Sequence, residues 1–198
     1  MRFDKVTWYN VSMIITILIL LMLVWAFFVG RSRGLALQTY YTIGSLVAIG
    51  LALQNYKTLS EKITLWVPFA SATANSQLSF YPAKLLFEID HVFYAIFAFL
   101  VIYLVVYGIV RFIGIFLGAL ENKTLFGSYG DTVAGVLSIC SAYFVLSLMM
   151  MVVSTVPVAT VQNHLYASGL VRFMLNQTPI FSSWLQETFI KQITNITI

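Results

Sequence analysis

Four long stretches of nearly unbroken apolar residues dominate the chain, and the polar residues gather between them. Each stretch approaches or exceeds the roughly 20 residues that a helix needs to cross the hydrocarbon core of a bilayer. We therefore predict an all-α integral membrane protein, a single membrane domain over residues 1–198, with four transmembrane helices at about 11–29, 35–53, 92–110 and 132–156. The first stretch exceeds the apolar core of a signal peptide, so we expect it to be retained.

A shorter amphipathic pattern lies in the loop between the second and third spans. Residues 58–67 place Leu59, Ile63 and Trp66 at helical spacing, and Pro68 follows them. Apolar residues on one face of a short helix favour a position in the plane of the membrane interface. The pattern predicts a short interfacial helix in this second loop.

The C-terminal tail, about 158–193, is too polar to cross a membrane but keeps apolar residues three and four positions apart. This spacing predicts two amphipathic helices, roughly 158–175 and 179–193. Thr178 suits the N-cap of the second helix and Pro179 suits its first turn. We expect the tail to lie on the membrane surface or to cover one end of the bundle, and binding in the groove of a partner is the alternative.

Composition supports a membrane protein. Hydrophobic residues make up 60% of the chain and charged residues 9%, whereas about a quarter of the residues in a soluble domain are charged. The net charge is +4, but the basic residues are scattered beside apolar stretches, so we expect no nucleic-acid partner. The expected partner is membrane lipid, and other membrane proteins or a second copy of the chain are further candidates.

The sequence GRSRG separates the first two spans and places Arg31 and Arg33 between Gly30 and Gly34. So short a connection predicts a helical hairpin, with the arginines holding its tip in water and the glycines allowing the reversal. Cytoplasmic loops are rich in Lys and Arg, so we predict a cytoplasmic tip and both termini outside. Arg111, directly after the third span, agrees with this topology, whereas the basic residues of the termini and of the second loop argue against it. The arginines are also candidate anchors for anionic lipid.

Small residues recur at every fourth position in two spans, which lets helix backbones approach closely in a membrane. They are Gly44, Ala48 and Ala52 in the second span and Gly130, Ala134, Ser138 and Ala142 in the fourth. We expect these positions to mark helix contacts. The alternative is that they reflect only the abundance of small residues in membrane helices.

Two further sets of polar residues are candidates for a role inside the bundle. Gln38, Thr42 and Ser45 share one face of the second span, and this face either hydrogen-bonds to another helix or lines a polar path. Arg111 and Asp131 lie at the ends of consecutive spans and form a candidate ion pair. Extension of the Arg111 side chain to the lipid headgroups is the simpler alternative.

Candidate chemistry is sparse. Glu88, Asp90 and His91 are the main cluster of titratable residues, and they are interpreted either as the aqueous end of the third span, which we favour, or as a proton relay or metal site. His164 stands alone in the tail. The chain contains no nucleotide-binding loop, no nucleophile elbow and no metal-ligand spacing. We therefore predict no enzymatic activity, no cofactor and no metal.

Two motifs resemble the bacterial colicin V production protein family. GRSRGLALQ, followed by Gly44 and Gly50, is similar to the first hairpin of that family, and FGSYGDTVAG is similar to the beginning of its fourth span. Asp131 and Gly135 fall on matching positions, and we count Gly135 among the helix-packing positions. The chain departs from the family at Thr132, where a basic residue is frequent.

The resemblance implies a protein of the bacterial cytoplasmic membrane that is required for production or export of a peptide toxin such as colicin V and has wider roles in the envelope. It implies no established catalytic mechanism. The alternative is a small oligomeric channel or transporter that uses the Gln38 face together with Tyr103 and Tyr107 of the third span. The spans carry no charged residue near mid-membrane and no evident inverted repeat, which argues against transport. A hydrolase that uses His91 ranks third.

Overall fold

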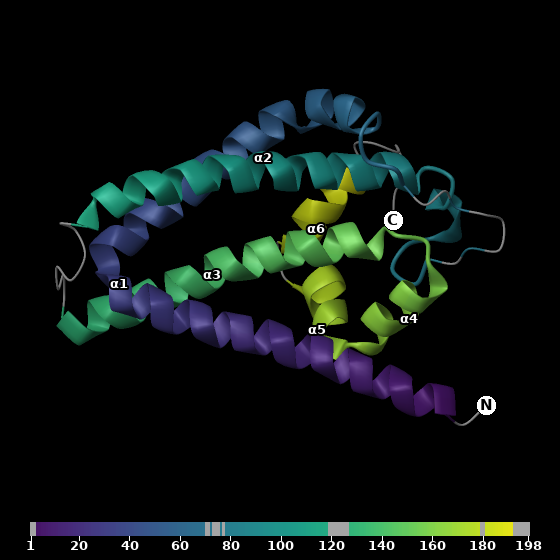
Figure 1. Cartoon of the computed structure of the whole chain (residues 1–198), viewed down its shortest axis with the longest axis horizontal. Coiled ribbons are helices and arrows are strands. Elements are labelled where there is room, and N and C mark those ends of the chain that lie inside the picture. The colour runs from purple at the N-terminus through teal and green to yellow at the C-terminus, as the bar shows by residue number, and fades with distance from the viewer. Residues whose placement is uncertain are drawn as a thin grey trace. The chain divides into compact units, whose positions relative to one another are not determined.

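Most of the described part of the chain is helical, and turns or irregular segments connect the helices (Figure 1). The structure is a computed structural model that describes residues 3–69, 72, 76, 78–118, 127–178 and 181–191, without the side chains of 3–10, 181 and 191. The elements are α1 (Phe3–Ile63), a 3-10 helix (Ala83–Leu85), α2 (Ile89–Phe116), α3 (Gly127–Ser154), α4 (Ala159–Ala167), α5 (Gly169–Arg172), α6 (Phe181–Gln186) and π-helical turns at Phe173–Gln177 and Glu187–Lys191. The predicted all-α class is confirmed over these residues.

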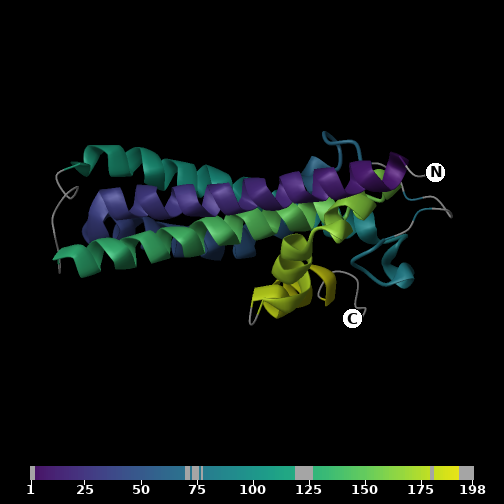
Figure 2. The ribbon, with the colours of Figure 1, turned by 90° about the horizontal axis from the view of Figure 1, so that it is seen from below.

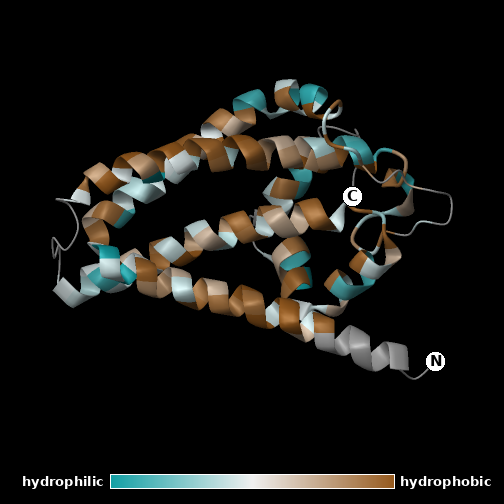
Figure 3. Ribbon diagram, in the orientation of Figure 1, coloured by the Kyte–Doolittle hydropathy of each residue, from teal (hydrophilic) through white to brown (hydrophobic). Residues whose placement is uncertain are grey.

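Three helices in the described residues are long and apolar enough to cross a membrane: the Val11–Ile63 part of α1, α2 and α3. Brown, hydrophobic residues cover most of their length (Figure 3). Predicted spans one and two both fall in α1, span three falls in α2 and span four in α3. The chain is therefore a membrane protein, and the number of four crossings stays a prediction.

A bend at Gly34 divides α1. Gly34 has φ 77° and ψ 166°, a non-helical conformation inside the helix, and glycine adopts it without the clash that a Cβ would cause. The chain reverses direction at this point (Figure 1). The predicted tip of five residues is therefore corrected: residues 30–33 stay helical, and one glycine makes the bend.

The predicted interfacial helix at 58–67 is not confirmed as a separate element. Helix α1 continues without a break to Ile63, and a turn follows in which the Trp66 and Val67 amides donate to the Ile63 carbonyl. The physical reason is that no glycine or proline lies between the end of the second predicted span and Ile63.

The tail contains more breaks than predicted. Ser168 is extended, with φ −78° and ψ 114°, and its hydroxyl accepts a hydrogen bond from the Val171 amide at the start of α5. This cap divides the predicted helix 158–175 into α4, α5 and a π-helical turn.

The Thr178 side chain serves the preceding turn. Its hydroxyl lies 3.1 Å from the Phe173 carbonyl and 3.3 Å from the Met174 carbonyl. The threonine hydroxyl therefore donates backward along the chain, while the Thr178 backbone carbonyl accepts a hydrogen bond from the Ser182 amide at 3.1 Å at the beginning of α6. The predicted N-cap role of the side chain stays a prediction. Pro179 and the end of the predicted helix beyond residue 191 lie outside the described residues.

The chain divides into two compact units. The first comprises Met1–Leu18, Tyr56–Ala98 and Ser147–Ile198, and the second comprises Ile19–Asn55 and Phe99–Leu146. In the second unit, the two arms of α1, the end of α2 and the start of α3 run alongside one another (Figure 2). The core of this unit includes Phe99 and Tyr103 of α2 in edge contact with Phe144 of α3.

Candidate functional site: an arginine and tyrosine cluster near the bend of α1

Two arginines meet on one tyrosine ring in the second unit. Arg33 precedes the bend of α1, Tyr41 follows it, and Arg111 belongs to α2. The guanidinium carbons of Arg33 and Arg111 lie 5.2 Å and 4.9 Å from the centre of the Tyr41 ring. Arg111 also lies 5.9 Å from the ring of Tyr107, one turn earlier in α2. These distances are within the range of cation–π attraction.

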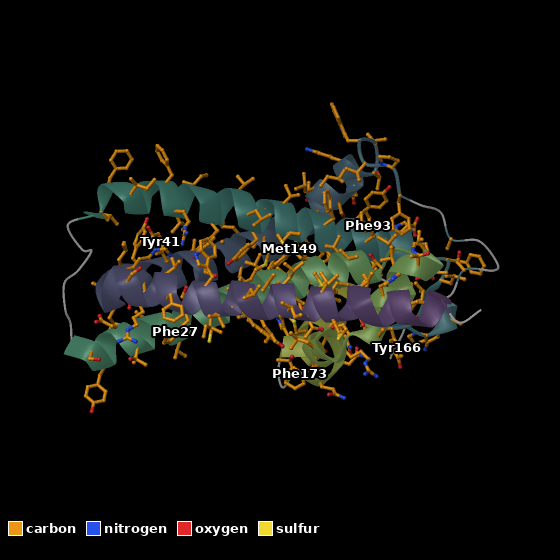
Figure 4. All side chains as sticks on the ribbon, turned by 60° about the horizontal axis from the view of Figure 1, so that its bottom comes forward. Phe27, Tyr41, Phe93, Met149, Tyr166 and Phe173 are labelled. Atoms are coloured by element: carbon orange, nitrogen blue, oxygen red, sulfur yellow. The ribbon has the colours of Figure 1, made fainter. Side chains whose placement is uncertain are left out.

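The Tyr41 ring is fixed in place by close helix packing. Its side chain is 5% exposed and is labelled in Figure 4. A Cβ on Gly114 would overlap the Tyr41 hydroxyl and ring, so only glycine leaves room for the tyrosine at this point of α2. The neighbouring Tyr40 hydroxyl donates to the Val110 carbonyl at 3.2 Å. The second arm of α1 is thereby held against α2 beside the arginines.

The cluster continues into the core of the unit. Tyr107 stacks on Tyr103, with the ring centres 5.6 Å apart. The Tyr103 hydroxyl shares a hydrogen bond of 2.8 Å with the Ser45 hydroxyl on the second arm of α1. Tyr103 also packs edge-on against Phe144 of α3 at 5.3 Å. The rings of Tyr107, Tyr103 and Phe144 therefore connect Arg111 on α2 with α3, and the hydrogen bond between Ser45 and Tyr103 joins the second arm of α1 to them.

The three residues of the predicted polar face have different surroundings. Gln38 is 1% exposed, and its side-chain carbonyl oxygen has no hydrogen-bond partner among the described residues. The Thr42 hydroxyl donates to the backbone carbonyl of Gln38 at 2.9 Å, whereas Ser45 bonds to Tyr103 of α2. Only Ser45 thus makes a recorded hydrogen bond between helices.

The predicted small-residue positions lie mostly inside the molecule. Ala48, Ala52, Gly44, Gly130, Ala134, Gly135 and Ser138 are buried, and Ala142 is half-buried. A Cβ on Gly44 would overlap Val110, and one on Gly135 would come within 3.1 Å of the Phe27 backbone oxygen. Gly30 of the GRSRG sequence packs closely as well, because its Cβ would lie 2.7 Å from the Ala134 carbonyl oxygen and would overlap Ser138.

Arg111 contacts aromatic rings rather than its predicted partner. No ion pair joins it to Asp131 in the part of the chain that the structure describes, and Asp131 is half-buried near the start of α3. Arg31 is exposed at the bend. The two arginines of GRSRG therefore differ, since Arg33 contacts Tyr41 and Arg31 faces outward.

The titratable residues before the third span belong to the first unit. The Asp90 carboxylate accepts a hydrogen bond from the His91 amide at 2.9 Å, His91 is exposed and Glu88 is half-buried. Asp90 also lines a cavity of about 240 Å³ with Phe69 and Tyr94. His164, on α4, has its Nδ1 atom 2.6 Å from the Thr160 carbonyl oxygen.

Sequence reasoning missed a hydrogen-bonding centre at Gln162. This side chain is 1% exposed, and its amide nitrogen donates to the Ser154 and Val156 carbonyls at 2.6 Å and 2.9 Å. Its amide oxygen accepts the Ser79 amide at 2.9 Å. No pattern signals this role, because a single glutamine in an amphipathic segment is normally assigned to the polar face.

Tyr81 supports the same region of the first unit. Its hydroxyl lies 2.7 Å from the Ser154 hydroxyl, which itself donates to the Met151 carbonyl at 2.8 Å. The single serine proton is thereby used, so Tyr81 is the donor. Burial raises the pKa of Tyr81 to about 12.

Sequence reasoning also missed Tyr41 as the centre of the arginine cluster. Tyr107 and Arg111 are four residues apart, a spacing that places them on one helix face. That spacing is a usable signal for their contact. No comparable signal connects Arg33 with Tyr41, because the contact depends on the bend between them.

Long apolar helices, large exposed apolar side chains along them and buried small residues between them define a helical membrane protein. The chain belongs to the colicin V production protein family, which it matches over residues 15–179. It is similar to an uncharacterized transmembrane protein, YshB, of Bacillus subtilis (strain 168), with 26% identity over 172 residues, 86% of this chain and 94% of the relative. No solved structure matches the chain. The family that the sequence motifs resemble is confirmed.

Proposed function

We propose that the chain is a protein of the bacterial cytoplasmic membrane that supports production or release of a peptide toxin, and more broadly maintains the envelope, without catalysing a reaction. The observation that carries this proposal is the family match over residues 15–179. That match includes both short motifs of the sequence, and the family description names production of colicin V.

The proposed topology has four crossings, with both arms of α1 in the membrane. The arm from Val11 to Arg33 and the arm from Leu35 to Ile63 each contain more than the roughly 20 residues that a crossing needs. Large apolar side chains on the first arm face outward, as at Trp25, which is 71% exposed. The arginines at the bend favour a cytoplasmic bend and external termini.

A supporting role agrees with the way in which the polar side chains are used. Arg33 and Arg111 pack on an aromatic ring, and Gln162 uses both ends of its amide to hold backbone segments together. These contacts stabilise helix packing, which is the work expected of a protein that positions or accompanies other membrane components.

The test compares toxin release between a strain that produces a colicin V-type peptide and the same strain after deletion of the gene for this chain. We expect deletion to lower the ratio of released to cell-associated toxin and the wild-type chain to restore it. An Arg33→Ala/Arg111→Ala double variant should restore less than Arg31→Ala, its matched control on the exposed arginine. Unchanged release and unchanged total yield after deletion would reject the toxin role.

A small oligomeric channel is the second candidate, and one observation favours it. The carbonyl oxygen of Gln38, buried inside the chain, has no partner among the described residues, and a water or solute between the helices would satisfy it. Ion or solute flux in reconstituted vesicles that Gln38→Leu abolishes would support a channel. Absence of flux in the wild-type protein would remove this candidate.

A further inference from the structure

A cavity in the first unit combines one carboxylate with aromatic rings. Its volume is about 240 Å³, and its lining comes from the start of α2, the residues just before it and the segment that follows α1. The described lining residues include Asp90 and three aromatic residues, Phe69, Phe87 and Tyr94, and the others are aliphatic. A negative charge beside aromatic rings is a combination that recognises an organic cation.

The aromatic wall of this cavity is fixed by a hydrogen bond and by ring packing. The Tyr94 hydroxyl donates to the Val67 carbonyl at 2.8 Å, which holds the segment after α1 against α2. Phe69 of that segment packs on Phe93 with the ring centres 4.7 Å apart, and its ring centre lies 6.2 Å from that of Tyr94. Phe93 is labelled on α2 in Figure 4. A ligand therefore meets rings that are already in position, which lowers the entropic cost of binding.

Asp90 supplies the charge of the cavity. One of its carboxylate oxygens accepts the His91 amide at 2.9 Å, and a carboxylate has room for further hydrogen bonds. The described lining contains no basic residue, and the sequence from residue 67 to residue 83 contains no charged residue at all. A carboxylate in the first turn of α2 also complements the helix dipole, but that role needs no aromatic cavity beside it.

We propose that this cavity binds a primary ammonium group, which donates to the Asp90 carboxylate and lies against the rings of Phe69 and Tyr94. Such a group carries three N–H donors, and a charge-assisted hydrogen bond to a carboxylate is stronger than a neutral one. The headgroup of an amino phospholipid and a soluble amine both offer this group. The site is independent of the toxin role.

The test uses the full chain in dodecyl maltoside, a detergent without charge. The soluble probe is 2-phenylethylamine, and 2-phenylethanol is its neutral counterpart; their dissociation constants are measured by saturation-transfer NMR. The lipid probe is phosphatidylethanolamine, and phosphatidylcholine has the same charges but no N–H donor; bound lipid is counted by native mass spectrometry. We expect at least one primary amine to bind more tightly than its counterpart, by about tenfold for the soluble pair. Preference within the lipid pair alone assigns the ligand to a headgroup, and preference within the soluble pair alone assigns it to a free amine.

Three variants separate binding from folding. Asp90→Asn removes the charge but keeps an oxygen that accepts the His91 amide, and it should weaken binding of the preferred amine by about tenfold or more. Glu88→Gln is the matched control, because Glu88 is not among the described lining residues, and it should bind as the wild type does. Phe69→Leu keeps an apolar side chain, removes one ring and should weaken binding less than Asp90→Asn. The thermal unfolding midpoint of each variant without ligand shows whether it is folded.

Three results would overturn the proposal. The first is that neither primary amine binds more tightly than its counterpart. The second is equal affinity of the folded wild type and the folded Asp90→Asn variant for the preferred amine. The third is an equal loss of binding in Glu88→Gln and Asp90→Asn, which would show general attraction to a negative surface instead of recognition by the cavity.

Discussion

Replacement of Gln162 by alanine should destabilise the first unit more than its size suggests. The wild-type side chain makes three hydrogen bonds, to the Ser154 carbonyl, the Val156 carbonyl and the Ser79 amide. Each buried hydrogen bond contributes about 0.5–1.5 kcal/mol net, so the loss should be about 3 kcal/mol. For a chain of this length that corresponds to a decrease of roughly 6–12 °C in the unfolding midpoint.

The assay is thermal unfolding in detergent, followed by circular dichroism. Gln186→Ala is the matched control, because Gln186 is half-buried and makes one long hydrogen bond, 3.4 Å, to the Leu175 carbonyl. Gln162→Met retains the volume without the amide and should resemble Gln162→Ala. If Gln162→Ala loses no more stability than Gln186→Ala, or if Gln162→Met is as stable as the wild type, the hydrogen bonds do not hold this region.

Two further predictions concern packing and pH. Gly30→Ala should lower the free energy of unfolding by about 1–3 kcal/mol, because its Cβ would overlap Ser138, whereas the Cβ of Gly50→Ala meets open space; equal midpoints for the two variants would contradict the packing. The pKa of Tyr81 is raised from 10.0 to about 12, so the folded state keeps the tyrosine proton more strongly than the unfolded state. The contribution of Tyr81 to the free energy of unfolding is complete below pH 10 and is lost as the pH rises through 12, by about 3 kcal/mol in total; Tyr81→Phe should lack this loss in alkaline unfolding titrations.

The sequence predicted the apolar helices well because their signal is a sum over many residues. Predicted spans three and four, 92–110 and 132–156, fall within or close to α2 and α3. The predicted and observed ends of the helices differ because apolar residues mark the part of a helix that lies in lipid, whereas the backbone hydrogen bonds of the helix continue beyond that part. Helix α2 continues six residues beyond its predicted end for this reason.

The short amphipathic segments were less predictable because single residues decide them. One extended residue, Ser168, ends α4 and caps α5. In the second loop, no glycine or proline lies between residue 53 and Ile63, so α1 stays continuous through the beginning of the predicted interfacial helix. Apolar spacing describes a helix face, but it does not show where a cap or an extended residue interrupts that face.

The candidate site depended on information that no local pattern contains. Tyr107 and Arg111 share a helix face, so their contact follows from spacing. The role of Gly114 does not, because it appears only when the Tyr41 ring is placed against α2. The same is true of Gly30, which was assigned to chain reversal and instead brings α1 close to α3.

The bend and the arginine cluster form one unit of structure. Arg33 and Tyr41 lie on opposite sides of Gly34, and a straight helix would separate their backbones by about 12 Å along its axis. The bend allows the second arm of α1 to lie against α2, where Gly114 receives Tyr41 and Arg111 reaches the same ring. The glycine that reverses the chain therefore also creates the place where two guanidinium groups meet. A substitution that straightens α1 would disrupt the topology and the arginine cluster together, whereas Arg111→Lys changes the cluster and leaves the bend intact.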